Sequence, residues 1–357
     1  MTGTATIPLV RAEGDPFTIG RCHGAARSGP LRAFIGDSLC RLNRVMQPPV
    51  SMEELLPTIA AYDEEIAKAA PDLAEEIEGL ARGADISRAH ASLLQLRREI
   101  MGYRKIPTLG DCTTYARAGS GAGLGGGEPV LAQTVDLNGN LDDQISVLEV
   151  ARTGSARRVL VLSFAGLLGY LGLNSDGLAV GLNLVLGGQW RPGLPPYLAI
   201  RHLLDTAASV DEAVAALRGM RLASSRSITL CDPTKAAYVE VVEDELRVVE
   251  AAQTVHTNHL LHADLAPRDE LNVFARNSSL RRLDACRRGL ASVPQQAGVE
   301  DHFALLSAPP ICVPDGGDIR LERTVAAVVM LPSRGELYVR PGDPSAAKTQ
   351  AFTLRHG

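Results

Sequence analysis

The sequence reads TTYAR at residues 113–117, PVLAQTVD at 129–136, ISVLEVAR at 145–152, RRVLVLSF at 157–164 and GLAVGLNLV at 177–185. Each segment is rich in β-branched and aliphatic residues and is bounded by Gly, Pro, Asn or Asp, which is typical of short strands between turns. Consecutive strands with no helical pattern between them predict a meander of antiparallel strands. This stretch therefore decides the fold class.

Helical apolar spacing precedes that stretch. Residues 52–70, 71–87 and 87–101 predict three helices, with Ser87 as the N-cap of the third. Gly83 stands where the end of the second helix needs a residue that tolerates positive φ. The residues before Ser51 are marked by Gly and Pro and are expected to be irregular.

After residue 185 the pattern alternates again. Helical spacing covers 196–220 and 278–290, strand patterns cover 227–233, 236–243 and 246–251, and a hairpin of 324–332 and 336–342 closes the chain. Runs of strands that alternate with runs of helices indicate antiparallel sheets with helices on their outer faces. We expect an α+β fold, a four-layer αββα sandwich of two antiparallel sheets.

The composition restricts the partners. The 357 residues carry 36 Lys and Arg against 41 Asp and Glu, a net charge of −5, and only 4% are aromatic. Neither nucleic acid nor an anionic membrane is an expected partner. The longest apolar run, 159–173, is short for a membrane span. Six cysteines without CxxC pairs, and an opening without a signal-peptide pattern, favour a cytoplasmic protein with reduced thiols.

Three motifs suggest chemistry but have simpler explanations. The glycines of 119–127 lie between two strand patterns and open no helix, so a hairpin loop is favoured over phosphate binding. His256, His259 and His262 lack the accompanying ligands of usual zinc sites, so we expect no metal and no cofactor. The arginines at 281, 282, 287 and 288 are interpreted as a solvated helix face.

Cys112 lies where the helical segments give way to strands. A thiolate is a strong nucleophile when a base stands nearby, and a cysteine at a new chain start has its own α-amine. A single cysteine is more often a small buried apolar residue. The residue alone leaves both interpretations open.

Fragments along the whole chain resemble one family. They are GDPFTIGRCHGAA (14–26), DCTT (111–114), AQTVDLNGN (132–140), GYLGLNSDGLAVGLNLV (169–185), VHTNHLL (255–261) and ERTVAAVVMLPSRGELYV (322–339). Taken in this order, they resemble the penicillin acyltransferase family (peptidase C45, isopenicillin N acyltransferase-like) of self-processing N-terminal-nucleophile (Ntn) hydrolases.

The resemblance implies self-cleavage between Asp111 and Cys112, giving an α-chain (1–111) and a β-chain (112–357) that stay together as one compact heterodimer of about 12 and 26 kDa by residue share. It implies that Cys112 forms an acyl-enzyme from a small amide, peptide or acyl-thioester, a coenzyme A thioester among them, and passes the acyl group to water or an amine. The implied catalytic residues are Cys112, Asp136, Asn258, Arg323 and Thr114, and the implied substrate contacts are Asn174 and Tyr115.

One departure leaves alternatives open. The family junction usually has Gly before the cysteine, whereas Asp111 stands here. Glycine eases a strained scissile peptide, and an aspartate either assists or crowds it. An unprocessed, catalytically silent binding or scaffold protein, and a thiol hydrolase that works without cleavage, are the alternatives.

Overall fold

The computed structural model describes residues 6–102, 112–119 and 127–355. Its helices are α1 (Pro16–Gly36), α2 (Leu42–Val45), α3 (Met52–Ala69), α4 (Pro71–Ala84), α5 (Arg88–Met101), α6 (Pro196–Thr206), α7 (Val210–Arg218), α8 (Val273–Ser292) and α9 (Val299–Ser307). Its strands are β1 (Leu9–Gly14), β2 (Thr113–Arg117), β3 (Val130–Leu137), β4 (Ile145–Arg152), β5 (Arg158–Phe164), β6 (Leu171–Asn174), β7 (Ala179–Leu184), β8 (Arg226–Cys231), β9 (Ala236–Val242), β10 (Glu245–Ala251), β11 (Gln253–His256), β12 (Arg323–Leu331), β13 (Glu336–Pro341) and β14 (Gln350–Thr353).

The strands form two sheets. The larger sheet has the order β1-β4-β5-β6-β7-β8-β9-β10, and the smaller has the order β11-β2-β3-β12-β13-β14. Every pair is antiparallel except β1 and β4, which run parallel. The expected meander is therefore wrong as a single unit, because β2 and β3 belong to the smaller sheet while β4 to β7 belong to the larger one. A strand pattern indicates a strand but does not say which sheet it joins.

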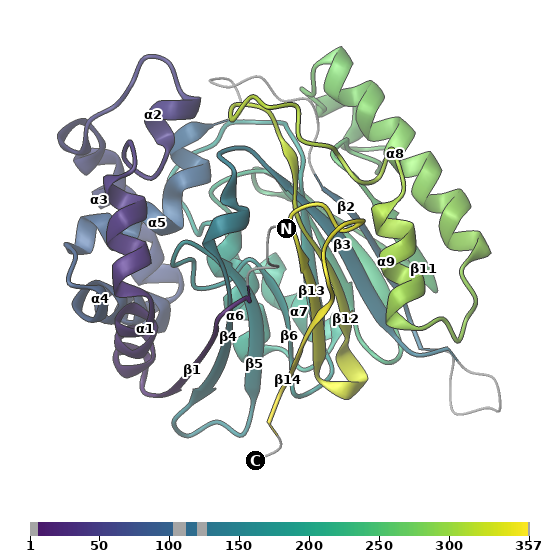
Figure 1. Ribbon diagram of the computed structural model, residues 1–357, viewed down its shortest axis with the longest axis horizontal. Coiled ribbons are helices and arrows are strands. Elements are labelled where there is room, and N and C mark those ends of the chain that lie inside the picture. The colour runs from purple at the N-terminus through teal and green to yellow at the C-terminus, as the bar shows by residue number, and fades with distance from the viewer. Residues whose placement is uncertain (1–5, 103–111, 120–126, 356–357) are drawn as a thin grey trace.

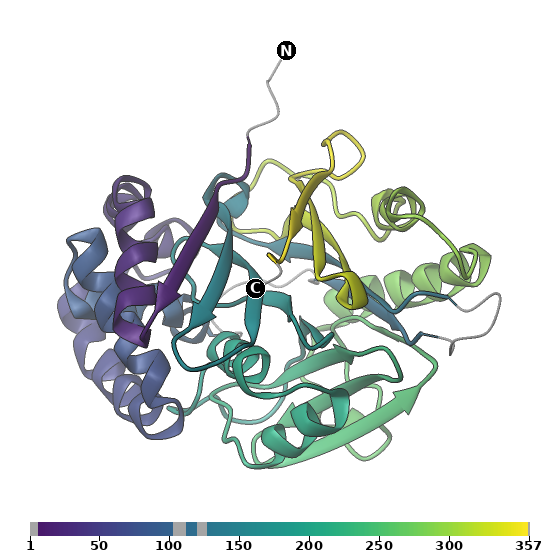
Figure 2. The same ribbon diagram turned by 90° about the horizontal axis from the view of Figure 1, so that it is seen from below.

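The sheets face each other between two helical layers. Helices α6 and α7 contact the larger sheet, and α8 and α9 contact the smaller one, so the order of layers is helix, sheet, sheet, helix (Figure 1). The four-layer αββα fold is confirmed. Helices α1 and α3 to α5 stand beside the edge strand β1 (Figure 2). No described helix is both long and apolar enough to cross a membrane.

The helices of the first hundred residues differ in one respect from expectation. α3, α4 and α5 form where the spacing predicts them, and Ser87 caps α5 by accepting from the His90 amide. The segment expected to be irregular contains α1, a helix of 21 residues. Asp15 caps it by accepting from the Thr18 amide at 2.7 Å, and Pro16 occupies its first turn. Two of the glycines that suggested irregularity lie on α1 and serve its packing against α4.

α1 and α4 touch through their backbones. A Cβ atom on Gly20 would lie 1.9 Å from the carbonyl oxygen of Glu76, and one on Gly79 would lie 2.1 Å from that of Phe17. Real Cβ atoms do not approach so closely, so only glycine allows these two helices to pack at this distance.

Gly83 belongs to the same contact, since its Cβ would lie 2.1 Å from the Arg21 carbonyl oxygen. Its expected role as the residue with positive φ is wrong. That conformation is adopted two residues later by Asp85, at φ 56°. Close helix packing and helix termination favour the same residue type, and the sequence does not separate them.

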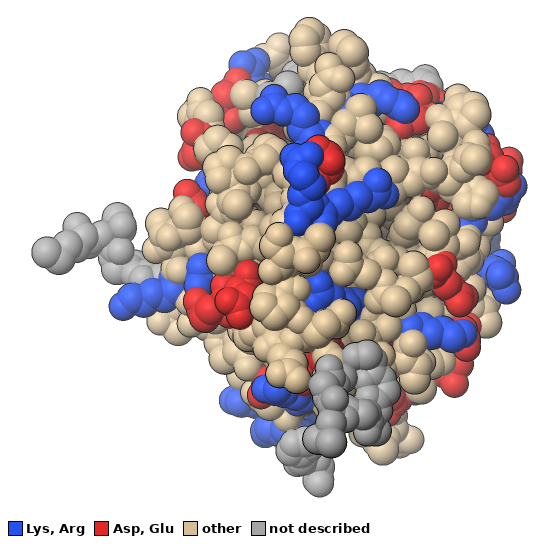
Figure 3. All heavy atoms as spheres, turned by 90° about the vertical axis from the view of Figure 1, so that its right-hand side faces the viewer, with Lys and Arg blue, Asp and Glu red and all other residues tan. Residues whose placement is uncertain are grey.

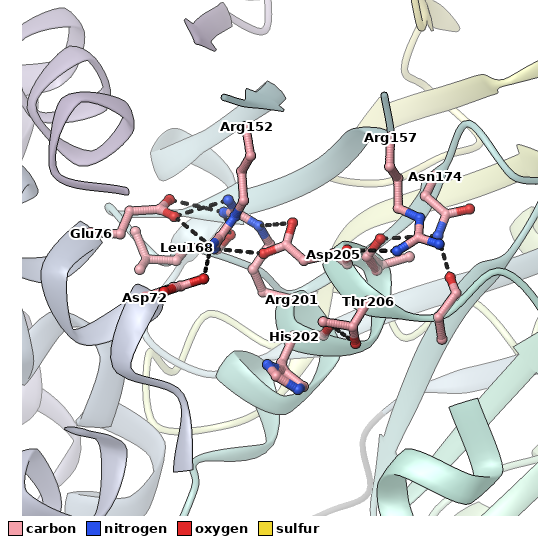
Figure 4. A network of polar contacts seen from close by, with 12 residues as sticks. Asp72, Glu76, Arg152, Arg157, Leu168, Asn174, Arg201, His202, Asp205 and Thr206 are labelled. Atoms are coloured by element: carbon pink, nitrogen blue, oxygen red, sulfur yellow. Dashed lines mark hydrogen bonds and ion pairs between the residues drawn. The ribbon is translucent and has the colours of Figure 1, made fainter. Parts of the chain in front are cut away.

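A buried ion-pair network joins the N-terminal helices to the sheets (Figure 4). Arg201 on α6 donates from both terminal nitrogens to the Glu76 carboxylate of α4, each at 2.9 Å, and both side chains are fully buried. Asp205 bridges Arg201 to Arg152 on β4, at 3.1 and 2.8 Å. Removing one partner of a buried pair costs about 3–5 kcal/mol. The network therefore ties the segment before residue 111 to the segment after it.

We predict that Gly79→Ala lowers the free energy of unfolding by about 1–3 kcal/mol, because the new methyl group must push α1 and α4 apart. Urea unfolding followed by circular dichroism measures the loss. Gly36→Ala is the control: Gly36 ends α1, and nothing lies within 4 Å of an added Cβ. Its midpoint should match the wild type, and equal midpoints for both variants would contradict the backbone contact.

Candidate functional site

A pocket of about 720 Å³, counted with its open mouth, lies at the end of the sandwich next to α5. Cys112, directly before β2, and Asp136, near the end of β3, both line it. The polar part of the wall also holds Gln95, Arg97, Arg98, Asn138, Tyr170, Tyr197 and Arg226, and the apolar part is Phe34, Leu94, Met101, Leu137, Leu141, Phe164, Ala165, Leu167, Leu182 and Leu184. The wall is mostly apolar, as is usual for small-molecule sites.

Cys112 is held at both ends. Its Sγ accepts from the backbone N–H of Asp136 at 3.4 Å and lies 3.8 Å from the Tyr170 hydroxyl. Its carbonyl oxygen accepts from Asn183 Nδ2 and from the Arg282 guanidinium, both at 2.9 Å. An N–H aimed at sulfur favours the thiolate, which is the nucleophilic form. The thiol therefore sits at a fixed place in the pocket wall.

Arg282 makes the central contacts of this site, and its interpretation as part of a solvated helix face is wrong. Only 1% of it is exposed. Besides the Cys112 carbonyl, its guanidinium donates to Thr113 Oγ1 at 3.1 Å and to Asn258 Oδ1 at 2.7 Å. Its neighbour Arg281 is exposed, and on the α8 side of the molecule Lys and Arg lie among Asp and Glu (Figure 3).

A sequence signal for Arg282 existed. The buried residues of α8 include Ser279, Arg282, Leu283, Cys286 and Leu290, which recur at helical spacing. An arginine within such a stripe is buried, and a buried guanidinium needs acceptors. The four clustered arginines of α8 do not share one environment, because Arg282 is buried while the other three are exposed.

Asn258 is held through both its side chain and its backbone. Its Nδ2 donates to the Leu184 carbonyl at 3.0 Å, while its Oδ1 accepts from Arg282. Its backbone N–H donates to Ser279 Oγ at 2.8 Å. Because Arg282 can only donate and a carbonyl can only accept, the amide orientation of Asn258 is determined. Arg282 thus connects Asn258 with Cys112.

Asp136 and Arg323 lie on neighbouring strands but have different partners. Asp136 Oδ1 accepts from Thr324 Oγ1 at 2.6 Å. Arg323 donates to Asn140 Oδ1 at 3.0 Å and to Asp142 Oδ1 at 2.5 Å, and no described contact joins it to Cys112 or Asp136. Successive residues of a strand point to opposite faces. The hydroxyl that supports Asp136 is therefore that of Thr324, which the sequence reasoning did not name.

Of the implied residues only Cys112 and Asp136 line the pocket, and Asn258, Arg323 and the other three do not. Thr114 Oγ1 is buried and has no hydrogen-bond partner among the described residues. Tyr115 points to the helix-covered face, where its hydroxyl lies 2.8 Å from His302 Nδ1. Asn174 accepts from the Asp176 and Leu178 amides and donates to two carbonyls at the end of α6, so it shapes a turn (Figure 4). A role for Tyr115 or Asn174 in holding substrate finds no support in this geometry.

The histidine segment is occupied by protein contacts. His256 Nε2 lies 2.8 Å from Glu240 Oε1, and His259 Nδ1 lies 2.7 Å from Ser279 Oγ. Burial lowers the pKa of His259 to about 4. Within the ranges that the structure describes, no group of three or more His, Cys, Asp or Glu could hold a metal ion. Most of the glycine segment (120–126) and Asp111 lie outside these ranges.

The remaining cysteines are in other places. Burial raises the pKa of Cys40 and Cys286 to about 12 and that of Cys312 to about 11, and it also raises the pKa of Cys231. High thiol pKa values disfavour the thiolate. All six cysteines are described, and of these only Cys112 lines the pocket.

Comparison with known proteins finds relatives over most of the chain. The Emericella nidulans acyl-coenzyme A:6-aminopenicillanic-acid-acyltransferase 40 kDa form is 28% identical over 272 residues, which cover 74% of this chain and 72% of that protein. Penicillin V acylase from Agrobacterium tumefaciens is 14% identical with a TM-score of 0.47, over 68% of this chain and 86% of that one. The Caenorhabditis elegans N-acylethanolamine-hydrolyzing acid amidase ortholog is 18% identical with a TM-score of 0.46, over 68% and 100%.

The family is settled by a family model that covers more than half of the chain. It is described as acyl-coenzyme A:6-aminopenicillanic acid acyl-transferase and matches residues 124–345. The match begins after Cys112 and includes Asp136, Asn258, Arg282 and Thr324. The chain belongs to the acyl-coenzyme A:6-aminopenicillanic acid acyl-transferase family.

Proposed function

We propose that this protein is a self-processing cysteine amidohydrolase or acyltransferase whose nucleophile is Cys112. The observation that carries the proposal is the fixed position of the Cys112 thiol in a mostly apolar pocket, with its sulfur accepting from the Asp136 amide and its carbonyl held by Asn183 and Arg282. A thiol placed in this way can attack the carbonyl carbon of a small acyl compound. The family membership makes acyl transfer the expected chemistry.

Self-processing would create the base that the thiol needs. The Cys112 thiol adds to the carbonyl of Asp111, the peptide nitrogen leaves with a proton, and a thioester results. This shift frees the α-amine of Cys112, and water then hydrolyses the thioester to release the thiol and a carboxyl group at Asp111. An α-amine has a pKa of about 8, so it can accept the thiol proton near neutral pH. The Thr113 amide donates to Thr134 Oγ1 at 3.1 Å, which anchors the chain just beyond this amine.

Turnover would then follow two steps. The Cys112 sulfur attacks the carbonyl of an amide or thioester, the amine or thiol leaves with the proton held by the α-amine, and an acyl-enzyme forms. Water or a second amine then attacks the acyl-enzyme and restores the thiol. In the proposal, Nδ2 of Asn258 donates to the developing oxyanion, and Asp136, supported by Thr324, orients the α-amine.

More than one class of acyl donor is proposed for this chain. The Emericella nidulans relative carries acyl-coenzyme A in its name, so a coenzyme A thioester is one candidate donor for this chain, beside small amides and peptides. The apolar wall suits the acyl part of either. Arg323, Thr114 and the α/β heterodimer remain predictions, as do a cytoplasmic location and the two alternatives of a silent binding protein and an uncleaved thiol hydrolase.

Intact-mass spectrometry tests the proposal. We expect fragments near 12 and 26 kDa from the purified wild type, the larger beginning at Cys112, because the thiol cleaves the bond before it. Cys112→Ala should give one mass near 38 kDa and no acyl transfer. Cys22→Ala is the control, since Cys22 lies on α1 away from the pocket, and it should cleave normally. A single unbroken mass in the wild type would sink self-processing as written.

A second prediction concerns Arg282 as a positioning residue. Arg282→Met removes the donor that orders Cys112 and Asn258, and three buried acceptors lose a partner. Such losses cost about 1–3 kcal/mol of stability, and the misplaced nucleophile should lower kcat about 100-fold with little change in KM. Steady-state kinetics on samples shown to be folded by circular dichroism measure this.

The matched control is Arg281→Met, because Arg281 is the exposed neighbour on the same helix. It should keep wild-type kcat and KM. Arg282→Lys should recover only part of the rate, since an ammonium group cannot span the three acceptors as a guanidinium does. A folded Arg282→Met protein with kcat within twofold of the wild type would remove Arg282 from the mechanism.

A further inference from the structure

We propose that the pocket beside Cys112 binds a carboxylate of the substrate through Arg97 and Asn138, so that the preferred substrates are small acylated amines that carry a carboxylate, such as N-acyl amino acids. This inference rests on the proposed function, because it names the substrate class of the same pocket. It follows from two buried donors that the protein itself leaves unused.

The first donor group is the Arg97 guanidinium, on α5 in the pocket wall. Its Nε donates to the Cys40 carbonyl oxygen at 2.8 Å, which fixes the side chain. Its Nη2 is buried and has no hydrogen-bond partner. No carboxylate within the described ranges pairs with it. A buried N–H of a guanidinium is costly to leave without an acceptor, and an anionic ligand would supply one.

The second donor is Nδ2 of Asn138, directly after β3. Only 3% of Asn138 is exposed, it lines the same pocket, and its Nδ2 has no partner. Buried amide groups are almost always hydrogen-bonded, so an unused amide donor on a residue that lines a pocket points to a ligand that completes it.

The two donors are neighbours. Gly139 follows Asn138 with φ +86°, and a Cβ there would lie 2.5 Å from Arg97 Nη2, so the guanidinium rests against this backbone. Arg41 secures the turn from the other side, donating to the carbonyl oxygens of Gly139 and Asn140 at 3.0 and 2.6 Å. The glycine and the turn together place Arg97 and Asn138 at one corner of the pocket.

A carboxylate fits this corner best. It is an acceptor with two oxygens, and it would satisfy both donors and the charge. Burial lowers the pKa of Arg97 to about 10, which keeps it protonated at neutral pH. Arg226 also lines the pocket, but unlike Arg97 it is paired with a carboxylate, that of Glu99 at 3.4 Å. Leu94 and Phe164 in the remaining wall suit an apolar acyl chain.

The test compares N-hexanoylglycine with N-hexanoylglycinamide, which differ only in the carboxylate. We expect wild-type protein to release hexanoate from the acid with a kcat/KM about 10- to 100-fold higher, the range of a hydrogen-bonded charge. Arg97→Met should bring this ratio close to one, and circular dichroism checks that the variant is folded. Asn138→Ala should lower the ratio less.

Two further variants sharpen the result. Arg97→Lys should keep part of the preference, and Arg82→Met, which removes an exposed charge on α4, should keep all of it. A wild-type ratio near one, or an unchanged ratio in Arg97→Met, would overturn the inference while leaving the proposed function intact.

If neither compound releases hexanoate, the proposed function fails for these substrates, and binding decides the inference separately. Calorimetric titration of the wild type should then give a Kd for N-hexanoylglycine at least tenfold lower than for the glycinamide, and Arg97→Met should abolish the difference. Equal Kd values for the two compounds in the wild type would overturn it.

Discussion

The buried guanidinium of Arg282 is the contact on which the site depends. It comes from α8 on the outside of the smaller sheet, and its ends reach the Cys112 carbonyl, the Thr113 hydroxyl and the Asn258 amide oxygen. A guanidinium removed from water is stable only where acceptors meet its fixed fork of donors. Those acceptors belong to the start of β2 and to the loop after its neighbour β11, so satisfying the charge also sets the distance between the proposed nucleophile and the proposed oxyanion donor.

The rest of the fold keeps the pocket closed on one side. α5 supplies part of its wall, and α5 belongs to the helical group before residue 111. That group is bound to the sheets by the Glu76–Arg201 pair and is itself compact because glycines let α1 and α4 approach. If the chain is cleaved before Cys112, these buried contacts are what would hold the two products together, since neither depends on an intact peptide at the junction.

Much of this structure could be predicted from residue patterns. The positions of β2 to β5, the helices α3 to α5 and the closing hairpin follow the apolar spacing, because in these elements local pattern and final burial agree. The helical state of α1 is not predicted by its residue pattern, because two of its glycines are required by packing against α4, which is distant in sequence. The division of the strands between two sheets was missed because strand patterns carry no information on partners.

The same limit applies to the site. Cys112, Asp136 and Asn258 are recognisable from short motifs, whereas Arg282 and Thr324 act through contacts between distant elements, and Arg323 and Thr324 differ only by strand face. Arg97 and Asn138 become candidates only once both are seen to line one pocket and to have an unused donor. Residue types indicate chemistry, but which of them meet is decided by tertiary packing.

The central claim is that acyl groups pass through Cys112. The most direct measurement mixes the protein with a hexanoyl thioester, quenches within one turnover, and maps the added acyl mass by digestion and tandem mass spectrometry. The account predicts one hexanoyl group on the peptide that begins at Cys112 and none on the peptides of Cys22, Cys40, Cys231, Cys286 and Cys312. Hexanoate release with the acyl group on another cysteine, or on none, would contradict it.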